Sequence, residues 1–260
     1  MATEHKDNWS SEASDAYQNA ASFVPKLATK VMQWLDPQKD DVILDVGCGD
    51  GVLNVEMAHI LAQGSGRVHG VDSSAAMIAA AKASAESAGL TDKCTFEVLD
   101  ATSLISTPSL QQQTFTKAFS NAALHWILRP AATREALFRG VRDALAPGAT
   151  FVFEMGGLGN VSEIRAALLT ADWVRDVMEN KVGGWKVERA EREWRPTKAD
   201  KGGVEGWVRL MAKQFFEVLP EGEREECIRE VVDVLEVVCR QPGGGHMYSY
   251  VRLRVVARKV

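Results

Sequence analysis

The first 157 residues alternate between short apolar runs and longer segments whose apolar positions recur at helical spacing. The short runs are rich in β-branched residues and predict strands, and the segments between them predict helices. The predicted strands cover 41–46, 67–71, 94–99, 116–119 and 150–153. The predicted helices cover 24–35, 52–61, 75–87 (capped by Ser73 or Ser74) and 131–145, the last stopping at Pro147-Gly148. This alternation predicts parallel βαβ units with helices on both faces of one sheet.

Beyond Gly157 the pattern is more helical. Helices are predicted over 161–178 and 204–218, and an apolar stripe from Ile228 to Cys239 predicts a third helix that packs in a core. Two more strands are predicted over 185–194 and 247–259, the second with basic residues on alternate positions. Together these elements predict an α/β fold with a seven-stranded, mostly parallel sheet, helices on both faces and a helical cap.

The pattern divides the chain into four parts. They are an N-terminal arm with a lead helix (1–36), the sheet core (37–157), a helical cap that includes one core strand (158–246) and the final core strand (247–260). The arm is polar apart from a few aromatic residues. Trp9, Tyr17 and Phe23 are predicted to form a lid that closes over bound ligands at the sheet core and excludes water.

A glycine-rich turn follows the first predicted strand. Gly47, Gly49 and Gly51 let the backbone approach a ligand closely and leave N–H groups at a helix N-terminus. Asp72 ends the second strand, where an acid can accept hydrogen bonds from both hydroxyls of a ribose. Asp100 ends the third strand, within reach of an adenine amino group. Because open parallel sheets bind ligands at the carboxyl ends of their strands, these residues predict a nucleoside site.

Two kinds of nucleoside cofactor use a glycine turn followed by an acid. The fingerprint of NAD(P) sites, G-x-G-x-x-G, would put its third glycine at position 52, which is Val52. Four acids, Asp45, Asp50, Asp72 and Asp100, gather at the site, and the turn has no Lys or Arg, which suits a cationic sulfonium nucleoside better than a pyrophosphate. An NAD(P)-dependent oxidoreductase stays the alternative from another class, together with a protein that binds the sulfonium nucleoside without catalysis.

The segment Val42-Ile-Leu-Asp-Val-Gly-Cys-Gly-Asp-Gly51 resembles the first motif of the class I S-adenosylmethionine (SAM)-dependent methyltransferases. Gly70-Val-Asp72 and Leu99-Asp-Ala101 are similar to the second and third motifs. The resemblance implies a Rossmann-like fold, SAM as methyl donor and S-adenosylhomocysteine as product. The cofactor site that it implies consists of Gly47, Cys48, Gly49, Asp50, Gly51, Asp72, Ser73, Met77, Asp100, Ala101, Asn121 and Ala122.

The segment after the fourth strand, Ser120-Asn-Ala-Ala-Leu-His-Trp126, faces the transferred methyl group in that fold. Methylases of DNA bases and of protein glutamine have Asp/Asn-Pro-Pro-aromatic there, and its absence disfavours nucleobase methylation. With Tyr250-Val-Arg-Leu-Arg254 and Trp194-Arg-Pro-Thr197, the segment resembles the trans-aconitate methyltransferase-like branch of small-molecule methyltransferases. That branch includes carboxyl O-methyltransferases and fungal S-methyltransferases of gliotoxin-type dithiols.

Features of the N-terminal arm decide which of these two activities we expect first. Trp9-Ser-Ser and Ala21-Ser-Phe-Val-Pro25 resemble the fungal S-methyltransferases, and the first 25 residues hold no arginine to pair with a tricarboxylate. S-methylation of a thiol or dithiol of secondary metabolism is therefore the first expectation. O-methylation of a small carboxylate or a hydroxyl is the alternative.

His125 is the histidine predicted at the reacting methyl group. Its unperturbed pKa of about 6.5 suits a general base for a thiol or a hydroxyl. The alternative is a histidine that is only hydrogen-bonded at the strand end. Trp126, beside it, is predicted as core or as a substrate platform.

Composition narrows the partners and the location. Lys and Arg number 30 against 35 Asp and Glu, and the resulting net charge of −5 is spread along the chain, which disfavours nucleic acid as a partner. No run approaches the roughly 18 apolar residues of a membrane span, and the start has no secretory signal, so we expect a cytoplasmic protein without a membrane partner. The four cysteines form no CxxC pair, so no metal site is expected. The sequence predicts no oligomeric state.

Overall fold

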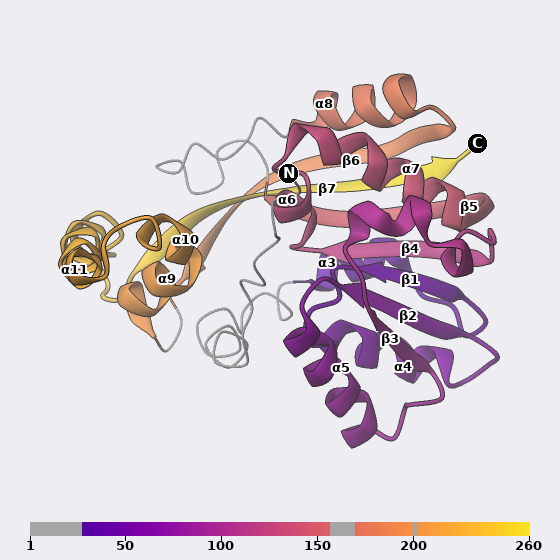
Figure 1. Ribbon diagram of the computed structural model, residues 1–260, viewed down its shortest axis with the longest axis horizontal. Helices are drawn as coiled ribbons and strands as arrows, with labels where there is room; N and C mark the ends of the chain where they lie inside the picture. The colour runs from indigo at the N-terminus through magenta and orange to yellow at the C-terminus, as the bar shows by residue number, and fades with distance from the viewer. Residues whose placement is uncertain (1–27, 157–169, 200–201) are drawn as a thin grey trace.

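The computed structural model describes residues 28–156, 170–199 and 202–260, and a seven-stranded sheet forms the centre of this part of the chain (Figure 1). The strands are β1 (Val42–Val46), β2 (Arg67–Asp72), β3 (Cys94–Val98), β4 (Phe115–Asn121), β5 (Leu145–Gly156), β6 (Trp185–Lys198) and β7 (Met247–Lys259). They lie in the order β3-β2-β1-β4-β5-β7-β6, and all neighbours are parallel except β7, which is antiparallel to β5 and β6. The predicted α/β fold with its mostly parallel sheet is confirmed.

Helices bury apolar side chains against both faces of the sheet. One face packs against α3 (Thr29–Leu35), α4 (Val52–Leu61) and the end of α5 (Ala75–Ser87). The other packs against α7 (Arg134–Ala144), α8 (Ala171–Arg175) and the π-helix η4 (Asp176–Val182) that continues it. Short helical turns complete the connections: η1 (Ala101–Ser106), η2 (Pro108–Leu110), α6 (Leu124–Ile127) and η3 (Ala131–Thr133).

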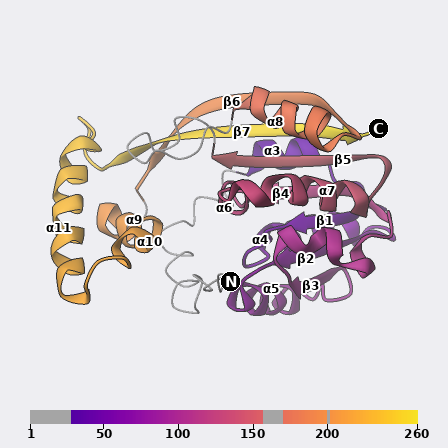
Figure 2. The same ribbon diagram turned by 45° about the horizontal axis from the view of Figure 1, so that its top comes forward.

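Three further helices form a separate helical module. They are α9 (Gly203–Met211), α10 (Lys213–Phe216) and α11 (Glu221–Val238). Their apolar side chains, among them Trp207 and Ile228, pack on Tyr248 and Tyr250 of β7 instead of on the sheet's central core. Figures 1 and 2 both show the module at one end of the long strands β6 and β7.

The pairing of β7 places this module relative to the sheet. Residues 252–258 of β7 pair with β5, whereas 247–251 pair with β6 alone. At about 3.3 Å per residue, the β6–β7 ribbon therefore runs roughly 16 Å past the carboxyl end of β5 before it reaches the module. The module stands on the side of the sheet at which the parallel strands end.

Several predicted boundaries are wrong. The helix predicted over 161–178 has a boundary at Thr170, which is extended and caps α8 with its side chain, and the helical segment then runs on to Val182. The helix predicted over 204–218 is interrupted at Ala212, between α9 and α10. The helix predicted to end at Leu145 ends at Ala144, because Leu145 is extended and pairs with Phe115.

Other predictions hold only in part. In the apolar stripe of α11, Ile228 is buried but Val238 is 62% exposed. In the lead helix, α3 confirms the segment from Thr29 onward, and the predicted lid residues of the arm lie outside the described residues. The four-part division of the chain stays a prediction.

Candidate active site

The glycine turn after β1 has the left-handed backbone that its sequence requires. Gly47, Gly49 and Gly51 have φ angles of +76°, +57° and +76°, which residues with a side chain rarely adopt. The N–H groups of Gly47 and Cys48 both donate to the carbonyl of Val71 on β2, at 2.8 and 3.1 Å. The end of β2 thus fixes the turn at the carboxyl edge of the sheet.

Close packing at two of these glycines contrasts with open space at the third. A Cβ on Gly47 would lie 2.3 Å from the Cβ of Ala123, and one on Gly51 would lie 2.8 Å from that of Ala81. A Cβ on Gly49 would meet no atom within 4 Å among the described residues. The outer side of Gly49 is therefore the part of the turn that a ligand can approach.

Asp72, at the end of β2, links the turn to the next helix. Its Oδ2 accepts from the N–H of Gly49 at 3.0 Å and its Oδ1 from the N–H of Ser74 at 2.9 Å. Each carboxylate oxygen has two lone pairs, so Asp72 can still accept from ribose hydroxyls. Ser74 is the cap of α5, accepting from the N–H of Met77, and Ser73 is exposed. Met77 is buried, as a core residue would be.

Asp45 is buried beneath the turn. It is 2% exposed, and its Oδ1 has no hydrogen-bond partner among the described residues. Burial, and then the charge of Asp72, raises the pKa of Asp45 to about 8, against a lowering influence of Asn54. Burial and the same acids raise the pKa of the Cys48 thiol well above its usual value. Cys48 therefore stays a neutral thiol and can offer the ligand its backbone.

The third predicted motif also lies at this edge. The Oδ1 of Asp100 accepts from the N–H and the hydroxyl of Thr102, at 2.9 and 2.8 Å, and so caps η1. Within the described part of the chain its Oδ2 is left to accept from a ligand. Ala101 is buried behind it. Asp50 is held to α5 through its carbonyl, which accepts from the Ser84 hydroxyl at 3.1 Å.

The end of β4 carries an unusual backbone conformation. Ala122 has a φ of +57°, and its N–H donates to the carbonyl of Glu154 at 2.8 Å. The side-chain Oδ1 of Asn121 is buried without a hydrogen-bond partner among the described residues. Left-handed non-glycine residues and orphaned buried oxygens concentrate at functional sites. Both lie beside the glycine turn, as the packing of Ala123 on Gly47 shows.

His125, in α6, is half-buried, and its protonation differs from the prediction. Its Nδ1 accepts from the N–H of Gly156 at 3.4 Å, which puts the proton of the neutral ring on Nε2. Burial, followed by the charges of Arg252 and Arg129, lowers the pKa of His125 to about 3. Burial and these two charges move the pKa of His125 away from the unperturbed value of about 6.5 on which the general-base prediction depends.

Trp126 is half-buried next to His125. The two rings have centroids 5.2 Å apart, and the guanidinium of Arg129 lies 4.1 Å from the indole centroid. Trp126 is thus held by a cation and a ring, and it is not part of the buried core.

The sequence reasoning missed the charged residues that surround this edge. Glu154, Arg252 and Arg254 are each 2% exposed, although charged side chains are rarely buried. The available signal was the alternation of basic residues along the last strand. This alternation does not reveal that Arg252 and Arg254 are buried, because β7 lies between β5 and β6, which are distant from it in the sequence.

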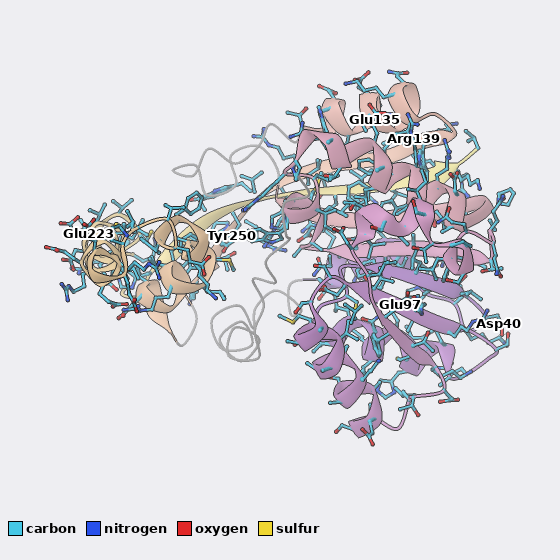
Figure 3. All side chains as sticks on the ribbon, viewed as in Figure 1. Asp40, Glu97, Glu135, Arg139, Glu223 and Tyr250 are labelled. Carbon is cyan, nitrogen blue, oxygen red and sulfur yellow. The ribbon has the colours of Figure 1, made fainter. Side chains whose placement is uncertain are left out.

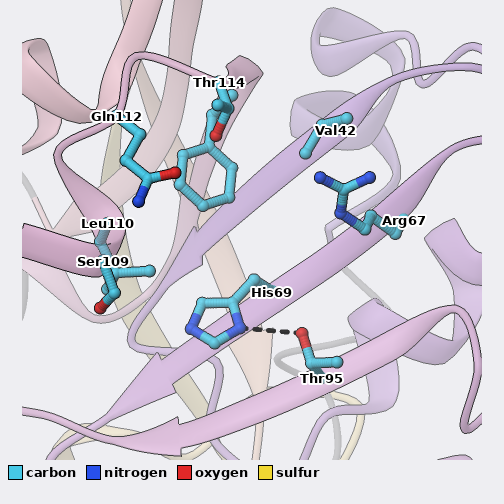
Figure 4. A pocket seen from close by; sticks show the side chains of 9 residues that line it. Val42, Arg67, His69, Thr95, Ser109, Leu110, Gln112 and Thr114 are labelled. Atoms are coloured by element: carbon cyan, nitrogen blue, oxygen red, sulfur yellow. Dashed lines mark hydrogen bonds between the residues drawn. The ribbon is translucent and has the colours of Figure 1, made fainter.

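The structure also has a cavity of about 230 Å³ outside this site, at the amino ends of β1, β2 and β4. Figure 4 shows Arg67 and His69 on its wall, with the His69 Nδ1 hydrogen-bonded to the Thr95 hydroxyl at 2.8 Å. It lies at the opposite ends of the strands from the glycine turn. The candidate active site consists of the glycine turn and the acids at the carboxyl ends of the strands, and this cavity is not part of it.

The carboxyl-edge residues fit SAM. The open side of Gly49 provides a cradle, and Asp72 and Asp100 are placed to accept from hydroxyl and amino groups. No group of three or more metal-ligating side chains occurs within the described ranges, and none of the helices described is long and apolar enough to cross a membrane.

Comparison with known proteins gives the family. The model of a methyltransferase domain matches residues 37–201. An uncharacterized methyltransferase of Schizosaccharomyces pombe is 33% identical over 279 aligned residues, which cover 98% of this chain and 99% of that protein. The chain therefore belongs to the methyltransferase domain family, and it is a SAM-dependent methyltransferase. This assignment decides against the oxidoreductase.

Solved structures share the fold at low identity. Phosphoethanolamine N-methyltransferase 2 of Haemonchus contortus, in complex with phosphomonomethylethanolamine and S-adenosylhomocysteine, has a TM-score of 0.60 at 16% identity, covering 98% of this chain and 58% of that one. A protein described for the conversion of a disulfide bond into a thioacetal group during echinomycin biosynthesis has a TM-score of 0.56 at 18% identity, covering 90% and 81%.

Gly49→Ala tests the cradle, with Gly89→Ala as the matched control. Both glycines are left-handed, at +57° and +68°, and an added Cβ meets no described atom within 4 Å at either. Each variant should lose about 1 kcal/mol of unfolding free energy for the backbone alone. Only Gly49→Ala should also weaken S-adenosylhomocysteine binding, by at least about tenfold, in isothermal titration calorimetry. Equal affinities of the two variants would place the cofactor elsewhere.

The pKa of Asp45 predicts how stability depends on pH. An unfolded Asp titrates near 3.9, so a folded pKa of about 8 means that the folded state holds the extra proton between these values. The free energy of unfolding of the wild type should therefore fall relative to Asp45→Asn as pH rises through this window, by up to about 1 kcal/mol per pH unit. Urea unfolding at several pH values measures this difference. The control is Asp92→Asn, an exposed carboxyl, and parallel curves for Asp45→Asn and wild type would contradict the assignment.

Proposed function

We propose that the protein methylates a small-molecule acceptor bound between the segment 121–126 and the helical module. The observation that carries this proposal is the position of the module, which the β6–β7 ribbon holds on the side of the sheet where β1 to β5 end (Figures 1 and 2). A cap over the carboxyl edge suits a small acceptor that is shielded from water. A cytoplasmic location without nucleic acid or membrane partners is part of the same proposal.

The chain's residues contribute positioning and electrostatics to the reaction. When bound, SAM would supply an electrophilic methyl group for the acceptor atom, and its sulfur would be the leaving group that keeps the electron pair of the broken carbon–sulfur bond. Asp72 and Asp100 would accept from hydroxyl and amino groups of the nucleoside, and the open side of Gly49 leaves room for it. Holding the two reactants in line in a desolvated site can provide much of the acceleration.

His125 fits a positioning role better than the predicted role of general base. A group with a pKa of about 3 is a weak proton acceptor at neutral pH. Its Nε2–H can instead donate a hydrogen bond to the acceptor, while Gly156 fixes the ring through Nδ1.

A metabolite thiol is the first acceptor class of this proposal, as predicted from the resemblance. The similar fold of the echinomycin protein, which is described for chemistry at sulfur, is compatible with it. A small carboxylate is the second class, and a specific observation favours it. The thiol ranks first because the N-terminal arm has no arginine, but the structure brings Arg252 of β7 near His125, in addition to Arg129 four residues along the chain.

Mass spectrometry of a matched acceptor panel tests the proposal. Purified protein with SAM is incubated with dithiothreitol, fumarate, trans-aconitate and catechol, with an RNA transcript as the macromolecular arm. At least one small molecule should gain a methyl group as S-adenosylhomocysteine accumulates. His125→Ala should lower its turnover by about tenfold or more, and the wild-type rate should show no inflection near pH 6.5. Methylation of the RNA alone would contradict the proposal.

A further inference from the structure

Charged side chains gather on one face of β5, β7 and β6, on the side of the sheet that carries α3. Residues directly opposite each other on neighbouring strands point to the same face. The register pairs Arg254 with Glu154 on β5 and with Glu191 on β6, and it pairs Arg252 with Gly156 and Glu193. We call this group the Glu154 cluster; its members are Glu154, Glu191, Glu193, Arg195, Arg252 and Arg254.

Arg254 is well compensated within the cluster. Its Nε lies 2.5 Å from the Oε2 of Glu154, and its Nη1 pairs with Glu193 and lies 3.7 Å from the Oε1 of Glu191. A buried guanidinium with three carboxylates around it is a structural element that ties β5, β7 and β6 together.

Arg252 is equally buried but poorly compensated. Its one ion pair among the described residues joins Nε to the Oε1 of Glu154 at 3.5 Å, and this Nε has no hydrogen-bond partner there. The same Oε1 already lies 3.4 Å from an Nη2 of Arg195. Burial lowers the pKa of Arg195, and Arg252 and Arg254 add to this effect while Glu154 opposes it. Arg252 also stacks on Tyr250, with 4.8 Å between its Cζ and the ring centroid. Figure 3 shows Tyr250 where β7 leaves the helical module.

The whole network has an excess of positive charge. Lys30 and Arg189 also bind its carboxylates, so five cationic side chains share three carboxylates in the described part of the chain. Lys30 and Arg189 are partly exposed to water, which can solvate them, but Arg252 is 2% exposed. A buried cation without an adequate partner is unfavourable, and a bound anion would remove that cost.

Arg252 is also close to the reacting end of the site. Its backbone pairs with Gly156, and the N–H of Gly156 donates to the imidazole of His125. The charge of Arg252 acts on His125 directly, as the lowered pKa of that ring shows. Asn121 and Ala122 precede His125 on the same connection, so Arg252 lies near the segment 121–126 against which the acceptor is proposed to bind.

We propose that Arg252 is the specificity-determining residue for the acceptor and binds a carboxylate of it. This inference rests on the proposed function and favours the second of its two acceptor classes, a carboxylate-bearing small molecule, over the thiol. A guanidinium matches a carboxylate in geometry and charge. The stack on Tyr250 orients its plane.

The reaction chemistry agrees with this class. A carboxylate arrives ionised, so its oxygen can bond to the methyl carbon with no proton to remove, and the product is a neutral ester. A thiol must lose its proton first, and His125 is a poor base for it. The polar residues on this edge therefore suit an acceptor that is already an anion.

Calorimetry on protein loaded with S-adenosylhomocysteine tests Arg252 apart from catalysis. The probes are phenylacetate, fumarate and trans-aconitate, with dithiothreitol as the uncharged counterpart. We expect at least one carboxylate to bind the wild type and to bind Arg252→Gln at least tenfold more weakly. The carboxylate affinity of Arg252→Lys should lie between those of the wild type and Arg252→Gln, since lysine keeps the charge but loses the planar, bidentate geometry of the guanidinium. Arg258→Gln is the matched control, because Arg258 is on the same strand and pairs with Glu188 at the surface, and it should bind like the wild type.

The outcomes separate this inference from the proposed function. Failure of the wild type to bind S-adenosylhomocysteine would count against the function itself. Carboxylate binding that is unchanged in Arg252→Gln would overturn the role of Arg252, and so would a wild type that methylates dithiothreitol and binds none of the carboxylates. If Arg252→Gln does not fold, Arg252→Lys is tested instead. A KM for the carboxylate that is the same in Arg252→Lys as in Arg258→Gln would overturn the inference.

Discussion

The carboxylate of Asp72 holds together the parts of the cofactor site. One oxygen accepts from Gly49 in the turn after β1, and the other accepts from Ser74 at the start of α5. With the two hydrogen bonds to the Val71 carbonyl, this fixes a left-handed turn that has no regular structure of its own to stabilise it. The path of the turn, with the open side of Gly49 outward, follows from these contacts. The burial of Asp45 beneath the turn is a further consequence, since the folded turn excludes water from its carboxyl.

The side of the site that is proposed to bind the acceptor carries positive charge, opposite in sign to the acidic residues at the cofactor position. Acidic residues gather at the proposed nucleoside position, whereas the charges of Arg252 and Arg129 act on His125. Glu154 links the end of β4 to the buried arginines. Its carbonyl accepts from the N–H of Ala122, and its carboxylate pairs with Arg254. The left-handed conformation of Ala122 is thus held by the same residue that anchors the buried arginines. This arrangement suits a cationic methyl donor and an anionic acceptor on neighbouring sides of one sheet edge.

The parts of the fold that the sequence predicts are those set by local physical chemistry. The run Val42–Val46, the glycines that require positive φ and a serine cap at 73 or 74 each specify their own conformation, so the first two βα units and the third strand are predicted within a residue or two. The interruption at Ala212 has no glycine or proline to announce it. It comes from packing within the helical module.

The acceptor side could not be predicted for a related reason. Arg252 and Arg254 come together with Glu154 and Glu193 only when β7 pairs with β5 and β6, and Lys30 of α3, more than two hundred residues away in the chain, binds Glu191 and Glu193 beside them. The pKa of His125 is lowered by its burial, by the charge of Arg252, which β7 brings from a distant part of the chain, and by the charge of the nearby Arg129. The titratable chemistry of the acceptor edge is therefore a property of the tertiary structure.

The measurement that tests the central claim most directly is the affinity for S-adenosylhomocysteine of the wild type and of Asp72→Ala, by isothermal titration calorimetry. The wild type should bind one molecule per chain, and Asp72→Ala should bind it at least about tenfold more weakly, because the ribose loses its acceptor and the turn loses its tie to β2. Equal affinities in two folded proteins would contradict the cofactor site described for this edge of the sheet.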